Sequence, residues 1–370
     1  MKSPLRIGIA GLGTVGSGVV KLLAEHGKLL ALRGGRPLKL VAVSARRKAK
    51  KRDIDLDGVR WENDPLSLAT ADDIDVVVEL IGGSGGVARR LVQKALGSGK
   101  HVVTANKALL AMHGAEIAAM AEAKGRMLAF EAAVAGGIPI IKALREGLVG
   151  NRVQRLYGIL NGTCNYILTT MRETGRDFDA VLAEAQAAGY AEADPSFDVD
   201  GIDAAHKLAV LTGAAFGAKV NFAGVHVEGI RRVSASDIQF AEELGFRIKL
   251  LGLARETSYG IEQRVHPCMV PLAAPIAHIE GVFNAVVVEG DFVGTTMFQG
   301  RGAGQGPTAS AVVADLVDVA RGREMPAFVV PAARLADKKV SPMERHEGAY
   351  YIRLMVQDRP GVIAAVSGAL

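Results

Sequence analysis

The stretch from Gly189 to Leu211, GYAEADPSFDVDGIDAAHKLAVL, gathers five carboxylates beside a single lysine. The lysine is Lys207, and the carboxylates are Glu192, Asp194, Asp198, Asp200 and Asp203. A lysine can transfer a proton to or from a reacting oxygen, and carboxylates can bind a substrate that carries an ammonium group. These residue types therefore suit acid–base chemistry on an amine-bearing molecule.

Lys207 lies in a segment whose pattern predicts a largely buried helix. The run IDAAHKLAVLTGAAF is apolar or small nearly all round, and Asp203 and Lys207, four residues apart, share one face of it. An exposed pair of this kind contributes only about 0.3–0.5 kcal/mol, whereas a buried lysine is costly unless it is paired or functional. Burial lowers the pKa of a lysine and nearby carboxylates raise it. We favour a catalytic lysine over a structural ion pair, with Asp203 orienting it.

The other acidic residues have structural as well as functional interpretations. We expect Glu192 and Asp198 to bind the substrate ammonium, while Asp200 stands where the N-cap of the next helix would lie. A metal site is the weaker alternative, because the spacing matches no EF-hand loop and only His206 could add a nitrogen ligand.

An N-terminal strand, turn and helix pattern predicts a dinucleotide site. LRIGIAGLGTVGSGVVKLLAEHG contains an apolar strand at 5–10, a GxGxxG turn and a helical pattern to about His26. In such a turn the first glycine permits the tight bend, the second lets the backbone approach a pyrophosphate, and the third lets helix and strand pack closely. The anion then faces the N-terminus of the helix. The predicted turn consists of Gly11, Gly13, Thr14, Val15 and Gly16.

The end of the second strand bears on the choice of dinucleotide. An NAD site normally has Asp or Glu there to bind the ribose 2′-hydroxyl, but after the strand at 38–43 this chain has Ser44, Arg46 and Arg47. The planar fork of arginine suits a 2′-phosphate, so we expect NADP(H) to be preferred. Use of NAD(H) and a merely solvated basic loop remain the alternatives.

Two further strands, at 74–82 and 100–111, continue the alternation, with a helix at about 88–96 between them. This alternation predicts an α/β fold with a Rossmann-type, doubly wound parallel sheet, whose ligands lie at the carboxyl ends of the strands. The residues expected at that edge are Gly82, Gly83, Thr104, Asn106 and Lys107. For Lys107, the alternative is a surface lysine at the start of a helix.

Composition restricts the class of protein. A chain of 370 residues with 49% hydrophobic and 22% charged residues predicts a well-buried protein of two or three domains. Six of its 44 basic residues lie in RRKAKKR, residues 46–52, which favours a local anion site over a nucleic-acid surface. Two cysteines argue against a disulfide framework. With no signal-peptide pattern and no apolar run of membrane-spanning length, we expect a cytoplasmic protein that does not bind membranes.

A second turn suited to an anion lies in VQRLYGILNGTCNYILTTM. The pattern predicts a strand at 157–160, a turn at 161–163 and then a helix. Backbone amides of such a turn can hold a carboxylate or a carbonyl oxygen. Cys164 raises the alternative of a thiol nucleophile, but no activating pattern accompanies it, so a small buried side chain is favoured.

These motifs together resemble the homoserine dehydrogenase family. GLGTVG, TANK, EAAVAGGIPII, GILNGTCNYIL and GYAEADPSFDVDGIDAAHKL occur in the order in which that family has them, over about residues 5–318. The resemblance implies a reversible reaction in which L-homoserine and NAD(P)+ give L-aspartate 4-semialdehyde and NAD(P)H. It also implies a role in the biosynthesis of threonine, isoleucine and methionine.

The resemblance implies roles for individual residues. Lys207 matches the family's catalytic lysine, with Asp203 as its acidic neighbour. The residues that match substrate contacts are Lys107, Gly162, Thr163, Tyr190, Glu192 and Asp198. Gly302 and Gly304 match a segment near the cofactor. A structural Na+ or K+ ion would be bound by the backbone carbonyls of Glu131, Val134, Gly136 and Ile138.

The expected domain organisation follows the same resemblance. Residues 1–137 would form the NAD(P)-binding Rossmann domain, 138–300 an α+β substrate-binding and dimerisation domain, and 301–345 a segment returning to the nucleotide domain. We expect a homodimer joined through a shared sheet, or a homotetramer. Residues 346–370 resemble the first strand, loop and helix of an ACT regulatory domain, with a ligand loop at 358–361. We expect this module to be incomplete, which leaves feedback inhibition by threonine open.

Two other functions are weighed against this one. A thiol-dependent aldehyde dehydrogenase using Cys164 would lose activity on Cys164→Ser, whereas a homoserine dehydrogenase would retain most of it. A non-catalytic, nucleotide-sensing regulator would bind the cofactor without turnover, and the intact pair of Asp203 and Lys207 counts against it.

Overall fold

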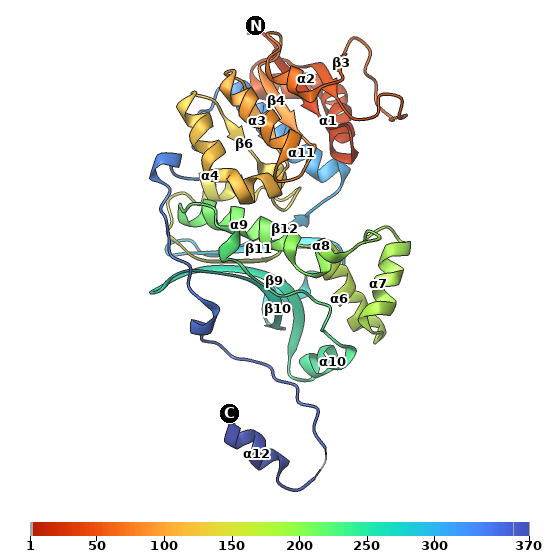
Figure 1. Ribbon diagram of the computed structural model, residues 1–370, viewed down its shortest axis with the longest axis vertical. Helices are drawn as coiled ribbons and strands as arrows, with labels where there is room; N and C mark the ends of the chain where they lie inside the picture. Colours follow the sequence, from red (N-terminus) through yellow and green to blue (C-terminus); the bar gives the residue numbers. More distant parts are fainter. Residues whose placement is uncertain (1–2, 358, 370) are drawn as a thin grey trace.

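Two six-stranded sheets make up the two halves of the molecule in the computed structural model, which describes residues 3–357 and 359–369 (Figure 1). The strands of the first sheet are β1 (Leu5–Ala10), β2 (Leu38–Ser44), β3 (Arg60–Glu62), β4 (Val76–Glu79), β5 (His101–Thr104) and β6 (Leu128–Ala129). They are all parallel, in the order β3-β2-β1-β4-β5-β6. The predicted doubly wound sheet is confirmed.

Helices cover both faces of this sheet. One face packs against α1 (Thr14–Glu25), α2 (Gly27–Gly34) and α11 (Gln305–Arg321), and the other against α3 (Gly86–Gly97) and α4 (Lys107–Ala123). Alternate side chains of β1 point to opposite faces, and all residues of the strand except Arg6 are buried. The helix α11 comes from far along the chain and packs against α1 and α2 of the nucleotide half.

The second sheet is mixed. Its strands are β7 (Val153–Ile159), β8 (His226–Val227), β9 (Phe246–Thr257), β10 (Gly260–Pro271), β11 (Phe283–Gly290) and β12 (Gly294–Arg301). Their order is β12-β11-β7-β9-β10-β8, and only β8 pairs in parallel with its neighbour. Around it lie α6 (Gly162–Thr174), α7 (Phe178–Ala187), α8 (Ser196–Val199), α9 (Ile202–Phe216) and α10 (Ala235–Glu243). This half has the predicted α+β character.

The helix α9 lies between the two halves (Figure 1). It packs against β7, β9 and β10 on one side and against α4 of the nucleotide half on the other. Its residues are buried from Asp203 to Ala214, because small side chains let neighbours approach from every direction. The prediction of a largely buried helix is confirmed, and it puts Lys207 at the junction of the halves.

Several predicted boundaries were wrong. The strand expected at 100–111 ends at Thr104, because the Asn106 side chain accepts the Leu109 N–H and caps α4. The segment after Pro139, whose pattern predicts one helix at 140–148, forms a short α5 (Ile140–Lys142) followed by a π-helical turn, η3 (Ala143–Gly147). Asp200 does not cap α9: Gly201 holds that position in the left-handed region, and the Asp200 carboxylate pairs with Arg231.

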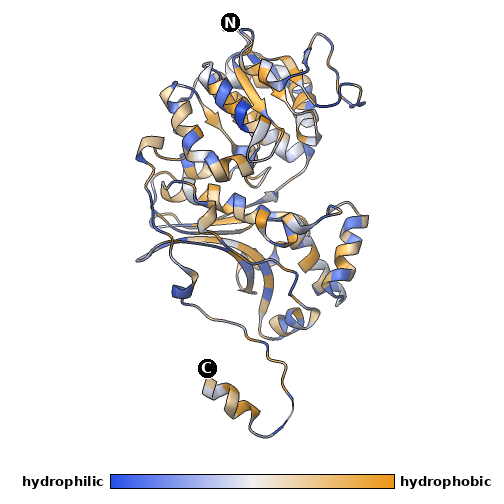
Figure 2. Cartoon of the chain, in the orientation of Figure 1, coloured by the Kyte–Doolittle hydropathy of each residue, from blue (hydrophilic) through white to orange (hydrophobic). Residues whose placement is uncertain are grey.

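The C-terminal segment extends away from the body of the molecule and ends in α12 (Val362–Ala369) (Figure 1). The expected helix is therefore present, but residues 350–357 do not form the expected strand, since no strand among the described residues supplies hydrogen bonds to them. Figure 2 shows how apolar α12 is, and Ile363 is 83% exposed. Residue 358, the first of the expected ligand loop, lies outside the described residues. Among those described, no helix combines the length and apolar character that crossing a membrane requires.

Candidate active site

The centre of the site is the carboxylate of Asp203, held between two lysines. Its Oδ2 lies 2.6 Å from the Lys207 Nζ, one turn along α9, and its Oδ1 lies 3.0 Å from the Lys107 Nζ. Lys107 is the first residue of α4 and follows the carboxyl end of β5. The cluster therefore joins the ligand edge of the parallel sheet to the second half of the molecule.

Burial and charge together determine the ionisation of Asp203. The residue is 4% exposed, and burial alone would raise the pKa of its carboxyl group. The ammonium groups of Lys207 and Lys107 and a hydrogen bond from Asn161 outweigh that effect and hold the pKa of Asp203 well below its usual value. The carboxylate is therefore charged at neutral pH.

Within the part of the chain that the structure describes, the Lys207 ammonium has one donor left for a ligand. Its Nζ donates to the Leu160 carbonyl oxygen at 2.7 Å and to Asp203 at 2.6 Å. An ammonium group has three donors, so two of them fix its position and the third is available to a substrate oxygen. The number of bonds alone does not distinguish Lys207, since the buried Lys100 also makes two. Its position does, because Asp203 links it to Lys107 at the ligand edge of the parallel sheet.

The turn before α6 connects this cluster to a second carboxylate. Asn161 donates through Nδ2 to Asp198 at 2.8 Å and to Asp203 at 2.9 Å, and its Oδ1 accepts the Cys164 N–H. The Thr163 hydroxyl lies 3.1 Å from Asp198 and 3.0 Å from the Tyr190 carbonyl oxygen. As the first residues of the helix, Gly162 and Thr163 have backbone N–H groups without intrahelical partners. The site thus offers carboxylates for an ammonium group beside amides for a carboxylate.

Not every predicted residue joins this cluster. The Tyr190 side chain is 49% exposed and stacks on Tyr166 with the ring centroids 4.7 Å apart. Glu192 is exposed, and its carboxylate makes no hydrogen bond or ion pair to any part of the chain that the structure describes. Their role as substrate contacts stays a prediction.

Sequence reasoning missed two members of the site. Asn161 was treated only as part of a turn, although an Asn directly before a helical pattern is an N-cap signal that could have identified it. Phe197 lies with its ring 5.6 Å from the Lys107 Nζ and 5.6 Å from the His206 ring. No spacing rule indicates that contact, because it joins residues from both halves of the molecule.

Cys164 has the properties of an inert thiol. Its side chain is fully buried, and burial raises the pKa of the thiol well above its usual value, with Asp198 and Asp203 adding to the effect. The Sγ donates to the Asp198 carbonyl oxygen at 3.2 Å. A nucleophilic cysteine needs an accessible thiolate, so the thiol-dependent alternative finds no support here.

The GxGxxG turn has the shape that a pyrophosphate requires. Gly11 has φ of 105°, and a Cβ there would lie 2.4 Å from the Leu80 carbonyl oxygen. A Cβ at Gly16 would lie 2.0 Å from the Gly11 carbonyl oxygen, whereas one at Gly13 would meet nothing within 4 Å. No side chain caps α1, so its first-turn N–H groups are open to an anion. The turn, which includes Thr14 and Val15, therefore fits a dinucleotide.

The residues at the ends of β4 and β5 are held together by Glu79, which sequence reasoning also missed. This fully buried carboxylate accepts the N–H groups of Ile81 and Gly82 at 2.8 and 3.0 Å and the Thr104 hydroxyl at 2.6 Å. The Asn106 side chain donates to the Gly83 carbonyl oxygen at 2.8 Å. The predicted residues at this edge are therefore neighbours.

The residues of the basic segment after β2 differ in their surroundings. Arg46 and Arg47 are exposed, while Ser44 is buried and accepts the Gly11 N–H through its carbonyl oxygen. Arg52 instead turns back to the glycine turn and donates to the Leu12 carbonyl oxygen at 3.1 Å. A cavity of about 390 Å3 opens beside it, lined by Lys48, Lys50, Arg52, Ile54, Leu56, Val59 and Trp61.

The backbone carbonyls expected to bind Na+ or K+ lie where the chain segments around Gly136 and Gly302 touch; each of these segments connects the two halves of the molecule. The Gly137 N–H donates to the Arg301 carbonyl oxygen at 3.0 Å, and a Cβ at Gly136 would lie 2.4 Å from the Gly302 carbonyl oxygen. Glu131, Val134 and Ile138 are all buried. Burial, with a smaller effect of Asp315, raises the pKa of the Glu131 carboxyl group to about 7. Within the described residues, no group of three His, Cys, Asp or Glu side chains could bind a metal ion.

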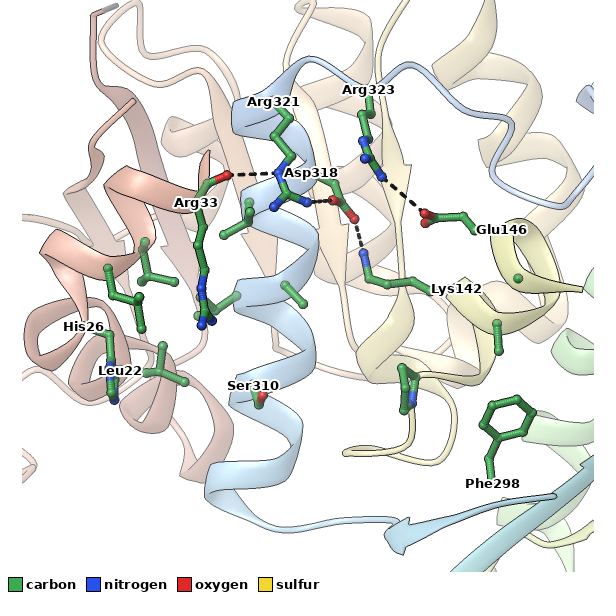
Figure 3. Close-up of a pocket in the computed structure, with 18 of the residues that line it drawn as sticks. Leu22, His26, Arg33, Lys142, Glu146, Phe298, Ser310, Asp318, Arg321 and Arg323 are labelled. Atoms are coloured by element: carbon green, nitrogen blue, oxygen red, sulfur yellow. Dashed lines mark hydrogen bonds and ion pairs between the residues drawn. The ribbon is translucent and has the colours of Figure 1, made fainter. Parts of the chain in front are cut away.

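A larger cavity, of about 760 Å3, lies between α1, α2, α11 and the segment 139–148, with Phe298 at one end (Figure 3). Its charged groups are mostly paired: Asp318 meets both Lys142 and Arg321, and Arg323 lies 3.3 Å from Glu146. It contains none of the residues predicted for catalysis or for ligand binding.

Comparisons with known proteins agree on one family. Residues 139–317 match the profile of "Homoserine dehydrogenase" and residues 11–131 that of "Homoserine dehydrogenase, NAD binding domain". A homoserine dehydrogenase from Pseudomonas aeruginosa is 51% identical over 99% of this chain and 85% of its own length. The crystal structure of a homoserine dehydrogenase from Thiobacillus denitrificans has a TM-score of 0.92 and 48% identity, over 99% of this chain and 85% of the other. A hyperthermophilic archaeal homoserine dehydrogenase in complex with NADPH is 27% identical, with a TM-score of 0.72 over 85% of this chain and 97% of the other.

Proposed function

The chain belongs to the homoserine dehydrogenase family, and we propose that Lys207 is the acid–base group of its reaction. The enzyme interconverts L-homoserine and L-aspartate 4-semialdehyde with a nicotinamide dinucleotide, a step of amino-acid biosynthesis. The observation that carries the proposal is the third donor of the Lys207 ammonium, which two fixed hydrogen bonds leave free.

The proton path follows from the ionisation of this group. When bound, the dinucleotide supplies the hydride for semialdehyde reduction or accepts it from homoserine. In reduction the Lys207 ammonium gives its free proton to the carbonyl oxygen, directly or through one water, and becomes an amine. In oxidation the amine takes the proton of the homoserine hydroxyl group. Asp203 stays ionised throughout and keeps Lys207 in place.

The substrate's own charges indicate how it is oriented. We infer that its ammonium group binds Asp198 and Glu192 and that its carboxylate faces the first-turn amides of α6 at Gly162 and Thr163, near the Tyr190 backbone. Lys107, which is 31% exposed at its side chain, points from the nucleotide half towards the same space. This orientation would bring the substrate oxygen to Lys207.

We also propose that NADP(H) is the preferred cofactor, with NAD(H) accepted. The cavity beside Arg52 adjoins the glycine turn and carries three basic side chains, which suit a 2′-phosphate. Arg46 and Arg47 would close over it from the same loop, and Gly302 and Gly304 would approach the nicotinamide end. The archaeal relative in complex with NADPH supports a phosphorylated dinucleotide.

The cofactor preference is testable at Arg52. Because a hydrogen bond to a charged group is worth about 1.5–3 kcal/mol, Arg52→Gln is expected to raise the KM for NADP+ by roughly tenfold or more and to leave that for NAD+ nearly unchanged. The measurement is the rise of reduced-nicotinamide absorbance with L-homoserine and each dinucleotide. Arg60→Gln, on the neighbouring strand β3, is the matched control. Equal changes for both dinucleotides would mean that Arg52 only supports the glycine turn.

A monovalent cation, Na+ or K+, is proposed at the carbonyls of Glu131, Val134, Gly136 and Ile138. Support comes from the backbone: Ala135 and Gly136 have φ of 56° and 47°, and this tight curl is buried. A non-glycine residue in the left-handed region costs energy, which a bound ion would offset. The expected result is a saturable rise of the unfolding temperature with NaCl or KCl that tetramethylammonium chloride at equal ionic strength does not produce. An equal response to all three salts would reject the site.

A homodimer or homotetramer is proposed from the edge of the second sheet. The outer edge of β12 faces no strand among those described, and the stretch from Gly294 to Gly300 has neither a charged residue nor a proline to discourage pairing. Light scattering at micromolar concentration is expected to give twice or four times the chain mass. A monomer under these conditions would contradict the proposal.

A further inference from the structure

Asn284, on β11, carries a buried amide that is not hydrogen-bonded. The residue is 1% exposed, and neither its Nδ2 nor its Oδ1 meets a donor or acceptor in the part of the chain described. Burying an amide without partners costs free energy that an apolar side chain of similar size would not cost. A residue retained only for packing would be better replaced by leucine.

The amide lies between two segments that the proposed function assigns to ligands. A Cβ at Gly302 would lie 2.2 Å from both the amide carbon and the Nδ2 of Asn284. On the other side, a Cβ at Gly162 would lie 3.4 Å from the Asn284 Oδ1. Gly162 begins the helix expected at the substrate, and Gly302 belongs to the connection expected at the cofactor. The approach at Gly302 requires glycine, whereas the contact at Gly162 is an ordinary van der Waals distance.

A neighbouring buried asparagine, Asn165, has an amide that is fully hydrogen-bonded. Asn165, on α6, is also 1% exposed, and its Nδ2 donates to the carbonyl oxygens of Ile279, Gly281 and Phe283. Its Oδ1 accepts from Lys249 at 3.1 Å. Asn165 therefore anchors the segment that leads into Asn284, so the fold already has a fully bonded amide here.

We propose that Asn284 is a positioning residue for hydride transfer. Its amide takes its hydrogen-bond partners from the backbone of residues 301–304 when that connection closes on the bound dinucleotide. The closed arrangement then sets the spacing between the cofactor segment and the N-terminus of α6. The inference rests on the proposed placement of cofactor and substrate on these two segments.

Asn284→Leu and Asn165→Leu form the matched test. In the free protein, Asn284→Leu is expected to raise the unfolding temperature by a few degrees because it removes an unpaired amide, whereas Asn165→Leu lowers it. With saturating NADP+, the rise of unfolding temperature seen for the wild type is expected to shrink in Asn284→Leu. Its kcat is expected to fall roughly tenfold, the equivalent of one lost hydrogen bond, with less change in the KM for homoserine. Asn284→Ala, which adds no bulk, gives the same ligand response where leucine does not fit.

Two outcomes would overturn the inference, and they are distinguishable. If Asn284→Leu and Asn284→Ala keep the full NADP+-induced rise and the wild-type kcat, Asn284 has no positioning role, and the proposed function stands. If the wild type itself shows no rise with NADP+ or with NAD+, the proposed cofactor placement fails and the inference fails with it.

Discussion

Lys207→Met is expected to lower kcat about a thousandfold, within the range that general acid–base catalysis contributes. Methionine keeps the length of the side chain and its packing within α9 but has no proton to give. Asp203 stays paired with Lys107, so the fold keeps one of its two ion pairs. The measurement is homoserine-dependent reduction of NADP+, together with a binding titration of the dinucleotide. Binding is expected to remain close to that of the wild type.

Lys100→Met is the matched control for this result. Lys100 is also buried, at 7% exposure, and its Nζ donates to the carbonyl oxygens of Ala71 and Ile74. It directly precedes β5, whereas Lys107 lies beyond the other end of that strand. Its replacement is expected to cost stability and leave kcat unchanged. Substantial turnover by Lys207→Met would assign Lys207 to structure and make Lys107 the next candidate for proton transfer.

Asp203→Asn is expected to reduce both stability and turnover. Asparagine has nearly the same shape as aspartate, so any loss of stability or turnover reports the missing negative charge, which pairs with the two ammonium groups. Breaking a buried ion pair leaves an uncompensated charge, and we expect a loss of roughly 3 kcal/mol in the free energy of unfolding at neutral pH. We expect kcat to fall about a hundredfold, because Lys207 loses the group that orients it. Urea unfolding and the turnover assay measure the two effects.

The direction of the Asp203 pKa shift determines how the stability loss in Asp203→Asn depends on pH. The pKa of Asp203 is lower in the folded protein than in the unfolded chain, so its ionisation stabilises the fold above the unfolded value. That contribution is lost as the pH falls towards the folded value. The stability difference between wild type and variant should therefore be constant from neutral pH down to about 4 and shrink below it. Asp53→Asn removes only the exposed ion pair with Lys21 and should change neither quantity. A similar loss in that variant would refute the role of burial.

Local patterns predicted the parts of the fold that local chemistry controls. The strand at 5–10 and the glycine turn after it were predicted at their observed positions. An apolar run and a glycine with positive φ can each be recognised from a few consecutive residues. The burial of α9 followed from its small side chains. The pairing of Asp203 with Lys207 followed from helical spacing.

Contacts between distant segments could not be predicted in this way. The ion pair from Lys107 to Asp203 joins two elements whose packing depends on the whole fold. The same holds for Glu79, which accepts hydrogen bonds from residues at the ends of two strands. It also holds for Arg52, which donates to the glycine turn at Leu12. Asp200 was predicted to be an N-cap from its position before a helical pattern. Its actual partner, Arg231, lies 31 residues away and leaves no local signal.

The return of α11 to the first sheet determines the order in which the protein can be completed during synthesis. Val312 and Leu316 of α11 pack in the same cluster as Ile7 and Ile9 of β1, so the face that α1 and α2 also cover is not complete until α11 has left the ribosome. The second sheet, whose strands lie between residues 153 and 301, is complete before that point. The nucleotide half, although its strands are synthesised first, is therefore the last to bury its core.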